Sequence, residues 1–196
     1  MKIKGFVLGL LEANGYIIYQ QEASACYIID PGAKADVFLD AVDRMALTCK
    51  GILLTHHHSD HVGGVEKIRK SLGCPVFIHR EDLDMYKKSA TPIEDREAFD
   101  LDGESIVVVH TPGHTKGSVC YYSEKSKLAF TGDTVFNVDL GRTDLVDGDE
   151  AQMVDSIKNV IDRWSNEITI YPGHGDSCNM KFVRKYNLEF LDIVGK

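Results

Sequence analysis

The sequence is poor in several features that define specialised classes of protein. The longest apolar stretches among its 196 residues, such as GILLT, VFI and YIID, fall far short of the ~20 residues that a membrane-spanning helix needs. Basic residues are outnumbered by acidic ones, 22 against 30, which gives a formal net charge of -8 and no cluster of Lys and Arg. We therefore expect neither a membrane span nor a nucleic-acid partner.

Cysteine is also scarce, and its pattern argues against two kinds of scaffold. The five cysteines are odd in number, far apart and never spaced as C-x-x-C. This pattern is typical of reduced cytosolic thiols rather than of a disulfide framework or a zinc ribbon. The N-terminal stretch MKIKGFVLGLLEANGY is interrupted by Glu12 and Asn14, and no small-residue cleavage site follows it, so we interpret it as a strand rather than an export signal. We therefore expect a cytoplasmic location.

What remains is the composition of an ordinary globular domain. With 43% hydrophobic and 27% charged residues, a chain of this length can bury a real core. No low-complexity linker and no short repeat divides it. We expect one domain covering residues 1–196, without a separate C-terminal substrate-binding domain.

Short runs rich in β-branched and aromatic residues predict strands, and segments with helical spacing lie between some of them. The predicted strands are IKGFVLG, GYIIYQ, ACYIIDPG, CKGILLT, PVFIH, SIVVVH, GSVCYYS, KLAFTGD and EITIYPGH. The predicted helices span about 34–47, 62–72, 80–88, 149–164 and 178–191. The polar, acidic stretch 89–104 is predicted to be a surface loop with its turn at Asp102 and Gly103.

The order of these elements indicates the fold class. Closely spaced strands predict hairpins, whereas the succession of GILLT, a helix and PVFIH predicts a βαβ unit, so the sheets should be mixed. Each half of the chain begins with clustered strands and finishes with a strand and a helix. This pattern predicts an α/β (α+β) fold in which two mixed β-sheets pack face to face with helices on both outer faces, a four-layer αββα sandwich.

The stretch LLTHHHSDHVGG concentrates four of the eight histidines beside an aspartate. The strand GILLT ends at Thr55, so the cluster lies past the carboxyl end of a buried strand, where open α/β sheets place their ligand crevices. In extended backbone, side chains two residues apart project to the same side, so His56 and His58 should point together and His57 away into solvent. Asp60 and His61 would face the same cavity from the entry of the next helix.

A solvated loop that happens to contain histidines is the alternative, and three other segments argue against it. His114, Asp133 and His174 each follow an apolar strand in a turn that contains glycine. Glycine permits the sharp turns and close backbone approach that side chains converging on a small volume require. Imidazole and carboxylate together suit Zn, Fe or Mn, so the sequence predicts a metal site.

The motif His56-x-His58-x-Asp60-His61, followed in order by His114, Asp133 and His174, resembles the ligand set of the metallo-β-lactamase superfamily. The resemblance covers nearly the whole chain and implies the αββα fold of that family. It also implies two divalent metal ions, with zinc expected and iron or manganese as alternatives. His56, His58 and His114 would hold one ion, Asp60, His61 and His174 the other, and Asp133 would bridge them. A hydroxide between the ions would be the nucleophile, with Asp60 orienting it and passing a proton to the leaving group.

Four further residues are candidates for supporting roles. Asp30 ends the strand of IIDPG and is expected either to fix the tautomer of a ligand histidine or to form an Asp-Pro turn. His110 is either a partner of a ligand or an ordinary histidine at a strand end. Arg142 and Asp144, in LGRTDL, resemble a segment of the short glyoxalase II-like hydrolases. They would brace the loop over the metals, or Arg142 would meet an anionic substrate.

The function implied by this resemblance is hydrolysis of a thioester such as S-lactoylglutathione. Full-length glyoxalase II grips glutathione with basic residues of a helical C-terminal region, for which Lys181, Arg184, Lys185 and Tyr186 offer at most a reduced version. A solvated basic helix face explains these residues equally well. The alternatives are a mononuclear-iron persulfide dioxygenase and a lactonase-type ester hydrolase. A small-molecule substrate is common to all three.

Overall fold

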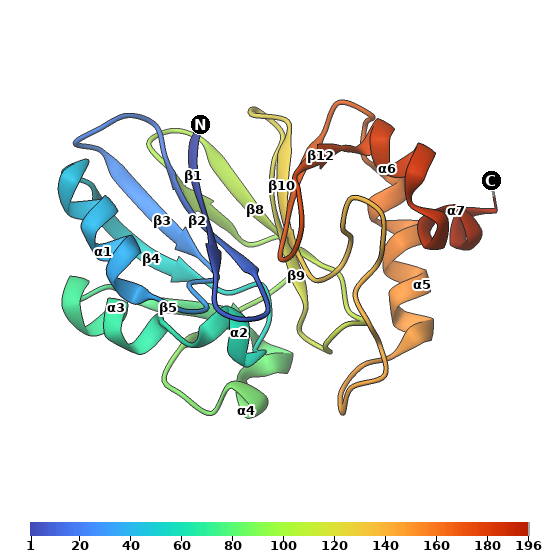
Figure 1. Ribbon diagram of the computed structural model, residues 1–196, viewed down its shortest axis with the longest axis horizontal. Coiled ribbons are helices and arrows are strands. Elements are labelled where there is room, and N and C mark those ends of the chain that lie inside the picture. Colours follow the sequence, from blue (N-terminus) through green and yellow to red (C-terminus); the bar gives the residue numbers. More distant parts are fainter. Residues whose placement is uncertain (196) are drawn as a thin grey trace.

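The computed structural model describes residues 1–195, which form two six-stranded sheets between two groups of helices (Figure 1). The strands are β1 Lys2–Leu8, β2 Ala13–Tyr19, β3 Ala25–Ile29, β4 Thr48–Leu53, β5 Val76–His79, β6 Thr91–Ile93, β7 Ala98–Asp100, β8 Ser105–His110, β9 Val119–Ser123, β10 Leu128–Gly132, β11 Thr169–Pro172 and β12 Cys178–Asn179. The helices are α1 Ala35–Arg44, α2 Ser59–Val62, α3 Val65–Leu72, α4 Leu83–Tyr86, α5 Glu150–Asn159, α6 Met180–Tyr186 and α7 Leu188–Val194, with 3-10 turns η1 Arg80–Asp82 and η2 Ile161–Arg163. Within residues 1–195, no helix has the length and apolar character to cross a bilayer.

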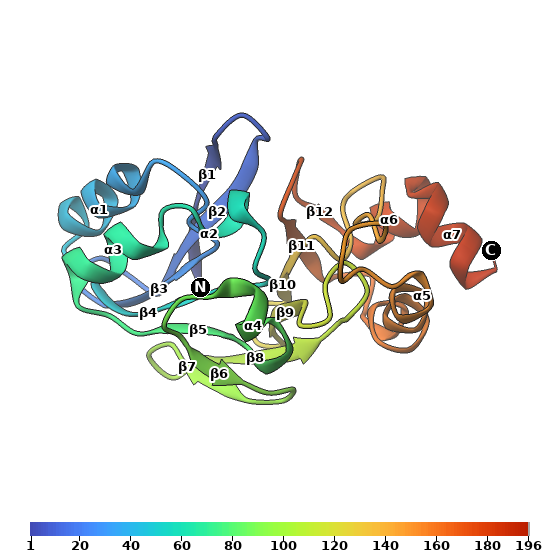
Figure 2. The same ribbon diagram turned by 90° about the horizontal axis from the view of Figure 1, so that it is seen from below.

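Both sheets are mixed, as predicted. The first has the order β1-β2-β3-β4-β5-β6, antiparallel from β1 to β3 and parallel from β3 to β6. The second has the order β12-β11-β10-β9-β8-β7 and is antiparallel except where β10 pairs with β11. Seen from below, α1 and α3 cover one side of the pair of sheets and α5, α6 and α7 cover the other (Figure 2).

Three apolar layers hold these elements together, and strand alternation assigns each side chain to its layer. On β2, Ile17 packs under α1 and α3, whereas its neighbour Ile18 faces the second sheet. On β10, Phe130 lies between the sheets and Ala129 packs toward α5. Burying each large apolar side chain contributes on the order of 2 kcal/mol. Three such layers require two sheets and two helical faces, so the predicted αββα sandwich is confirmed.

All nine predicted strands are present, and the differences lie at the ends of helices and in one loop. The predicted helix 62–72 is split into α2 and α3 at Gly63 and Gly64, because the backbone of Gly64 approaches Pro31 and donates its N–H to that carbonyl at 2.8 Å. The helix predicted over 178–191 is likewise two helices, because the Asn187 side chain accepts a hydrogen bond from the Phe190 N–H and begins α7. The prediction that 89–104 is wholly loop was wrong, since β6 and β7 are edge strands within it.

Candidate metal centre

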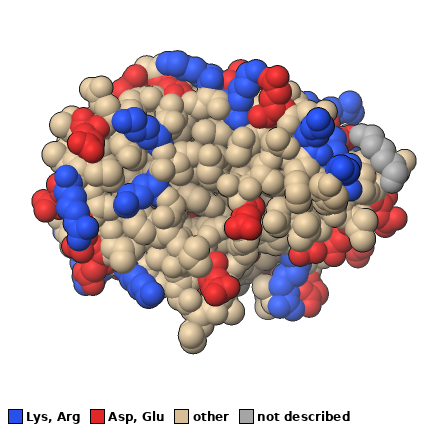
Figure 3. All heavy atoms as spheres, turned by 45° about the horizontal axis from the view of Figure 1, so that its top comes forward, with Lys and Arg blue, Asp and Glu red and all other residues tan. Residues whose placement is uncertain are grey.

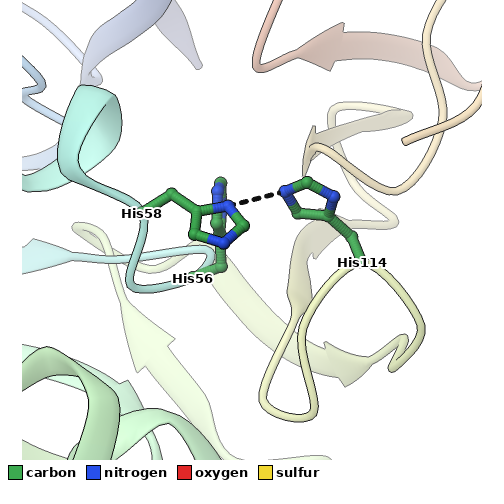
Figure 4. Close-up of side chains that lie close together, drawn as sticks. All are labelled: His56, His58 and His114. Atoms are coloured by element: carbon green, nitrogen blue, oxygen red, sulfur yellow. Dashed lines mark hydrogen bonds between the residues drawn. The ribbon is translucent and has the colours of Figure 1, made fainter. Parts of the chain in front are cut away.

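The structure brings six of the seven predicted ligands into two adjoining groups at the carboxyl ends of the strands, and the seventh, Asp133, lies between them. The nitrogen atoms of His56, His58 and His114 that face one another lie within 4.8 Å, and the three side chains converge from two loops (Figure 4). The second group consists of Asp60, His61 and His174, whose facing atoms also lie within 4.8 Å. Loops of the first sheet supply four of the seven residues, and loops of the second sheet supply His114, Asp133 and His174.

Asp133 lies between the two groups and is close to both. Its Oδ2 is 3.5 Å from Nε2 of His114 in the first group and 3.5 Å from Nε2 of His174 in the second. Its Oδ1 is 3.4 Å from Nε2 of His61. One carboxylate therefore faces histidines of both groups, which is the position that a bridging ligand would need.

Four of the histidines are oriented by a protein acceptor at Nδ1. Nδ1 of His61 contacts Asp30 Oδ2 at 3.1 Å, and Nδ1 of His56 contacts the hydroxyl of Thr55 at 3.0 Å. Nδ1 of His114 contacts the carbonyl of Arg142 at 2.7 Å, and Nδ1 of His174 contacts the carbonyl of Leu11 at 3.0 Å. Because each acceptor assigns the Nδ1 proton, the Nε2 lone pair of each ring is directed into the cluster. This is the tautomer in which histidine binds a metal through Nε2.

The described side chains leave some polar atoms of the cluster without a suitable partner. These are two buried polar atoms and one close pair of nitrogen atoms. His56 Nε2 and Asp133 Oδ1 are buried without a hydrogen-bond partner. His58 Nδ1 and His114 Nε2 are only 2.9 Å apart, so a proton or a cation must lie between their lone pairs. Buried polar atoms without partners are costly, and a divalent cation would satisfy all of these atoms together. The donor set of imidazoles and carboxylates fits Zn, Fe or Mn.

The two groups differ in charge. Burial and the neighbouring histidines lower the pKa of His56 well below its usual value and that of His58 to about 4, so both rings are neutral. In the other group, hydrogen bonds to Asp133 and Asp60 raise the pKa of His174 to about 10. Burial opposes ionisation of Asp60, but the hydrogen bond from His174 and the charge of His61 lower its pKa to about 2. In the metal-free chain, protons thus occupy lone pairs that a cation would take.

A glycine permits the close approach of the loops. A Cβ atom on Gly173 would lie 2.1 Å from Oδ1 of Asp133 and 2.8 Å from Cε1 of His61. No side chain fits there without displacing a candidate ligand, so the turn before His174 requires glycine.

The expected role of Asp30 in orienting a histidine agrees with its contacts. Besides His61, its carboxylate accepts the backbone N–H of Thr55 at 2.8 Å and the Thr55 hydroxyl at 2.5 Å. Asp30, His56 and His61 also lie close enough to form a metal-binding group by distance alone. Because the Asp30 oxygens are occupied by Thr55 and His61, we interpret Asp30 as an orienting residue.

The prediction that His57 is solvated was wrong. Its Nδ1 lies 3.0 Å from Oδ2 of Asp82, and its side chain is only 7% exposed. The fully buried Asp82 also accepts the backbone N–H of His57 and, from the loop that carries His114, the Thr115 hydroxyl and the Gly117 N–H. Asp82 therefore ties together the two loops that meet in the first group. Sequence reasoning missed it because no motif marks a lone aspartate in a 3-10 turn.

The three remaining candidates have side-chain partners outside the cluster. Nε2–H of His110 donates to the carbonyl of Lys116 at 2.8 Å, and the ring of His110 stacks on that of His79 with centroids 4.0 Å apart. None of the contacts found for His110 within residues 1–195 joins it to the two groups, which favours the interpretation as an ordinary histidine at a strand end. The side chains of Arg142 and Asp144 pair with each other at the surface, through Nε to Oδ1 at 2.6 Å and through the second guanidinium nitrogen at 2.8 Å. The contact of Arg142 with the cluster is made by its backbone carbonyl.

The C-terminal basic residues have partners outside the cavity, which favours a solvated helix face over a grip on substrate. Arg184 bonds the carbonyls of Asp162 and Trp164 and the side chain of Asn166. Lys185 lies over the ring of Tyr186. None of these basic residues lines the cavity above the cluster, as far as residues 1–195 show. On the face in Figure 3, basic and acidic side chains are interspersed around a largely uncharged centre, and no continuous basic patch is seen on that face.

A cavity of about 650 Å³ opens directly above the two groups. Its floor is formed by side chains of the cluster, and its walls include Leu11 from the turn between β1 and β2 and Phe136, Arg142 and Leu145 from the segment between β10 and α5. This volume is typical of small-molecule sites. A substrate in the cavity would meet the proposed metal positions at its floor.

Comparison with known proteins is consistent with this geometry. A family model described as the Metallo-beta-lactamase superfamily matches residues 8–174. An uncharacterized protein of Mycobacterium tuberculosis is 32% identical over 100% of both chains. The hydroxyacylglutathione hydrolase GloC of Haemophilus influenzae is 29% identical, covering 89% of this chain and 91% of its own. The solved structure of TTHA1623 in a di-iron-bound form aligns with a TM-score of 0.84 at 29% identity, covering 94% of this chain and 98% of the other.

Proposed function

From the premise that this chain belongs to the metallo-beta-lactamase superfamily, we propose that it is a dinuclear metallohydrolase that cleaves thioesters. The proposal rests on one observation, the convergence of five imidazoles and two carboxylates at the floor of a cavity of substrate size. His56, His58 and His114 would hold one cation, Asp60, His61 and His174 the other, and Asp133 would contact both. Bound cations lower the pKa of water from 15.7 toward ~7 and polarise a carbonyl oxygen.

The protein itself would orient the ligand histidines and the attacking water. The acceptors at Nδ1 hold the rings of His56, His61, His114 and His174 in one tautomer, so that no reorientation is needed when substrate enters. Asp60 is partly exposed to the cavity and ionised at neutral pH, so its free oxygen can accept a hydrogen bond from the attacking water and orient it.

A thioester suits a site with this set of side chains. A thiolate leaves readily because a thiol has a pKa near ~8.5, whereas an alkoxide or amine leaving group needs a strong proton donor. The cavity walls offer no neutral acid for that purpose among residues 1–195. The name of the Haemophilus influenzae relative, a hydroxyacylglutathione hydrolase, also supports thioester chemistry.

We propose zinc as the metal, with iron as the alternative that the di-iron-bound structure of TTHA1623 supports. Both groups of ligands are complete, which favours two cations over the single iron of a persulfide dioxygenase. The five free cysteines support a cytoplasmic location.

The experiment that tests this proposal is a steady-state assay of metal-replete protein against S-lactoylglutathione and a panel of simple thioesters, with metal content measured on the same samples. We expect two metal ions per chain and thioester hydrolysis that a chelator abolishes. Fully metallated protein that hydrolyses no thioester would exclude the proposed reaction. Oxygen uptake with glutathione persulfide by iron-loaded protein would favour the dioxygenase.

A further inference from the structure

Exposed apolar side chains are concentrated on the two segments that border the cavity. Six of the ten large hydrophobic residues that are exposed within residues 1–195 lie there. The turn after β1 and its flank carry Val7, Leu10 and Leu11, and the segment between β10 and α5 carries Val138, Leu145 and Val146. Leu10 is 102% exposed and Val146 is 95% exposed. Of these six, Leu11 and Leu145 line the cavity itself, and exposed apolar side chains beside a cavity are typical of a binding site.

The walls of the cavity carry few cationic side chains that could bind an anionic substrate. Arg142 is the only Lys or Arg that lines the cavity within residues 1–195, and its guanidinium is engaged at two points by Asp144. A substrate carboxylate would compete with Asp144 for that guanidinium. Asp139, which also lines the cavity, would repel such a group.

We propose that the substrate is an uncharged thioester with an apolar acyl chain, which lies between Leu11 on one wall and Leu145 on the other. This inference rests on the proposed thioester hydrolysis and adds the class of substrate. The reactive carbonyl sits over the cluster at the floor, and the alkyl chain extends between Leu11 and Leu145 toward the opening of the cavity. S-lactoylglutathione, with its small hydroxyacyl group and two carboxylates, is a poor match for these walls.

The test compares acyl chain length with charge in the metal-replete protein. N-acetylcysteamine thioesters with acetyl, butanoyl, hexanoyl and octanoyl groups form the uncharged series, and S-lactoylglutathione is the anionic comparison. Because each buried CH₂ contributes a roughly fourfold change in an equilibrium constant, kcat/KM should rise by up to about fourfold per added CH₂ until the cavity is filled. A flat or falling series, or a preference for S-lactoylglutathione, would overturn the proposal.

Two variants of the cavity walls and one matched control test whether the dependence of kcat/KM on acyl chain length arises at these walls. Leu11→Lys and Leu145→Lys each add a cation to a cavity wall, so the dependence on chain length should shrink below twofold per CH₂ and activity on the anionic substrate should rise relative to the uncharged series. Leu188→Lys makes the same change at an exposed position of α7 that does not line the cavity, and it should preserve the wild-type profile. Equal responses of all three variants would contradict the assignment of the walls.

A binding measurement keeps the substrate class separate from the reaction. Ketone analogues, in which CH₂ replaces the thioester sulfur of the same series, are titrated into metal-loaded protein by calorimetry. If no thioester is hydrolysed but Kd still tightens with chain length and Leu145→Lys removes that trend, the proposed reaction fails and the apolar ligand class stands. If Kd does not change with chain length, the inference about the substrate is wrong whatever the outcome of the assay.

Discussion

Replacing Asp30 with Asn would test whether a single carboxylate holds one metal group in its binding tautomer. Asp30 accepts the Nδ1 proton of His61 at 3.1 Å, while its other oxygen accepts the Thr55 N–H at 2.8 Å. Asn is nearly the same shape, and it tolerates the positive φ of 45° at this position. With its carbonyl retained toward the Thr55 N–H, its amide would present a second donor to His61.

Two donors cannot share that contact, so His61 is expected to move its proton to Nε2. Nε2 is the atom that lies 3.5 Å from Asp60 Oδ2 and 3.4 Å from His174 Nε2, and a proton there blocks the lone pair. Loss of an orienting partner of this kind typically weakens metal binding 10–100-fold, or about 1.4–2.7 kcal/mol. The loss should be largest in the group of Asp60, His61 and His174, and a smaller loss is expected in the other group, because the Thr55 hydroxyl that contacts His56 Nδ1 donates to the same Asp30 oxygen.

The assay is a competition titration of metal-free protein with zinc against a chromophoric chelator. The wild type is expected to show two sites, and Asp30→Asn should lose 10–100-fold in one affinity and less in the other. Asp139→Asn removes a carboxylate from the cavity wall without touching a histidine of the cluster, and serves as the matched control. Unchanged affinity at both sites in Asp30→Asn would refute the tautomer argument.

Four further outcomes follow from the structure. Gly173→Ala places a Cβ against a candidate bridging carboxylate, so we expect metal content, measured by elemental analysis, to fall below one ion per chain; retention of two would contradict the packing argument. Asp82→Ala leaves several buried donors without an acceptor, so urea denaturation should show a loss on the order of 3 kcal/mol, and a loss below about 1 kcal/mol would refute its linking role. Burial opposes ionisation of Glu104, but hydrogen bonds from Ser123, Ser126 and Gln20 lower its pKa from 4.5 to about 2. Its contribution is therefore present above pH 4.5 and lost as the pH falls toward 2, so Glu104→Gln should flatten the acid limb of the stability profile. In the metal-free chain the pKa of His174 is raised from 6.5 to about 10, so its stabilising charge is fully present below pH 6.5 and is lost as the pH rises through 10. Zinc uptake at neutral pH should accordingly release protons, which calorimetry in buffers of different ionisation enthalpy detects as a buffer-dependent heat.

The ligands of the proposed centre could be predicted because their signals are local. Each follows an apolar strand directly, and strand ends meet at one edge of a sheet, so the position of His114 or Asp133 follows from a few neighbouring residues. The alternation of side chains along extended backbone also predicted correctly that His56 and His58 converge. The accompanying prediction, that His57 points into solvent, was wrong. The side chain that points away from the metal groups meets another buried carboxylate instead of water.

What could not be predicted depends on contacts between distant segments. The carbonyls of Leu11 and Arg142 orient two histidines, yet any residue supplies a carbonyl, so no residue type marks these positions. The edge strands β6 and β7 have three residues each, and their pairing comes from β5 and β8 rather than from their own periodicity. The cavity walls likewise exist only once the β1 to β2 turn and the segment before α5 come together.

The division of the ligands between the two sheets has a mechanical consequence. Neither half of the chain supplies a complete set of the proposed ligands by itself, so each cation, once bound, would link one half of the chain to the other. Occupancy at 1,000 times the dissociation constant would add about 4.1 kcal/mol for each independent ion, a large fraction of the stability of a typical domain. Heat resistance of the whole chain should therefore follow the free metal concentration around it.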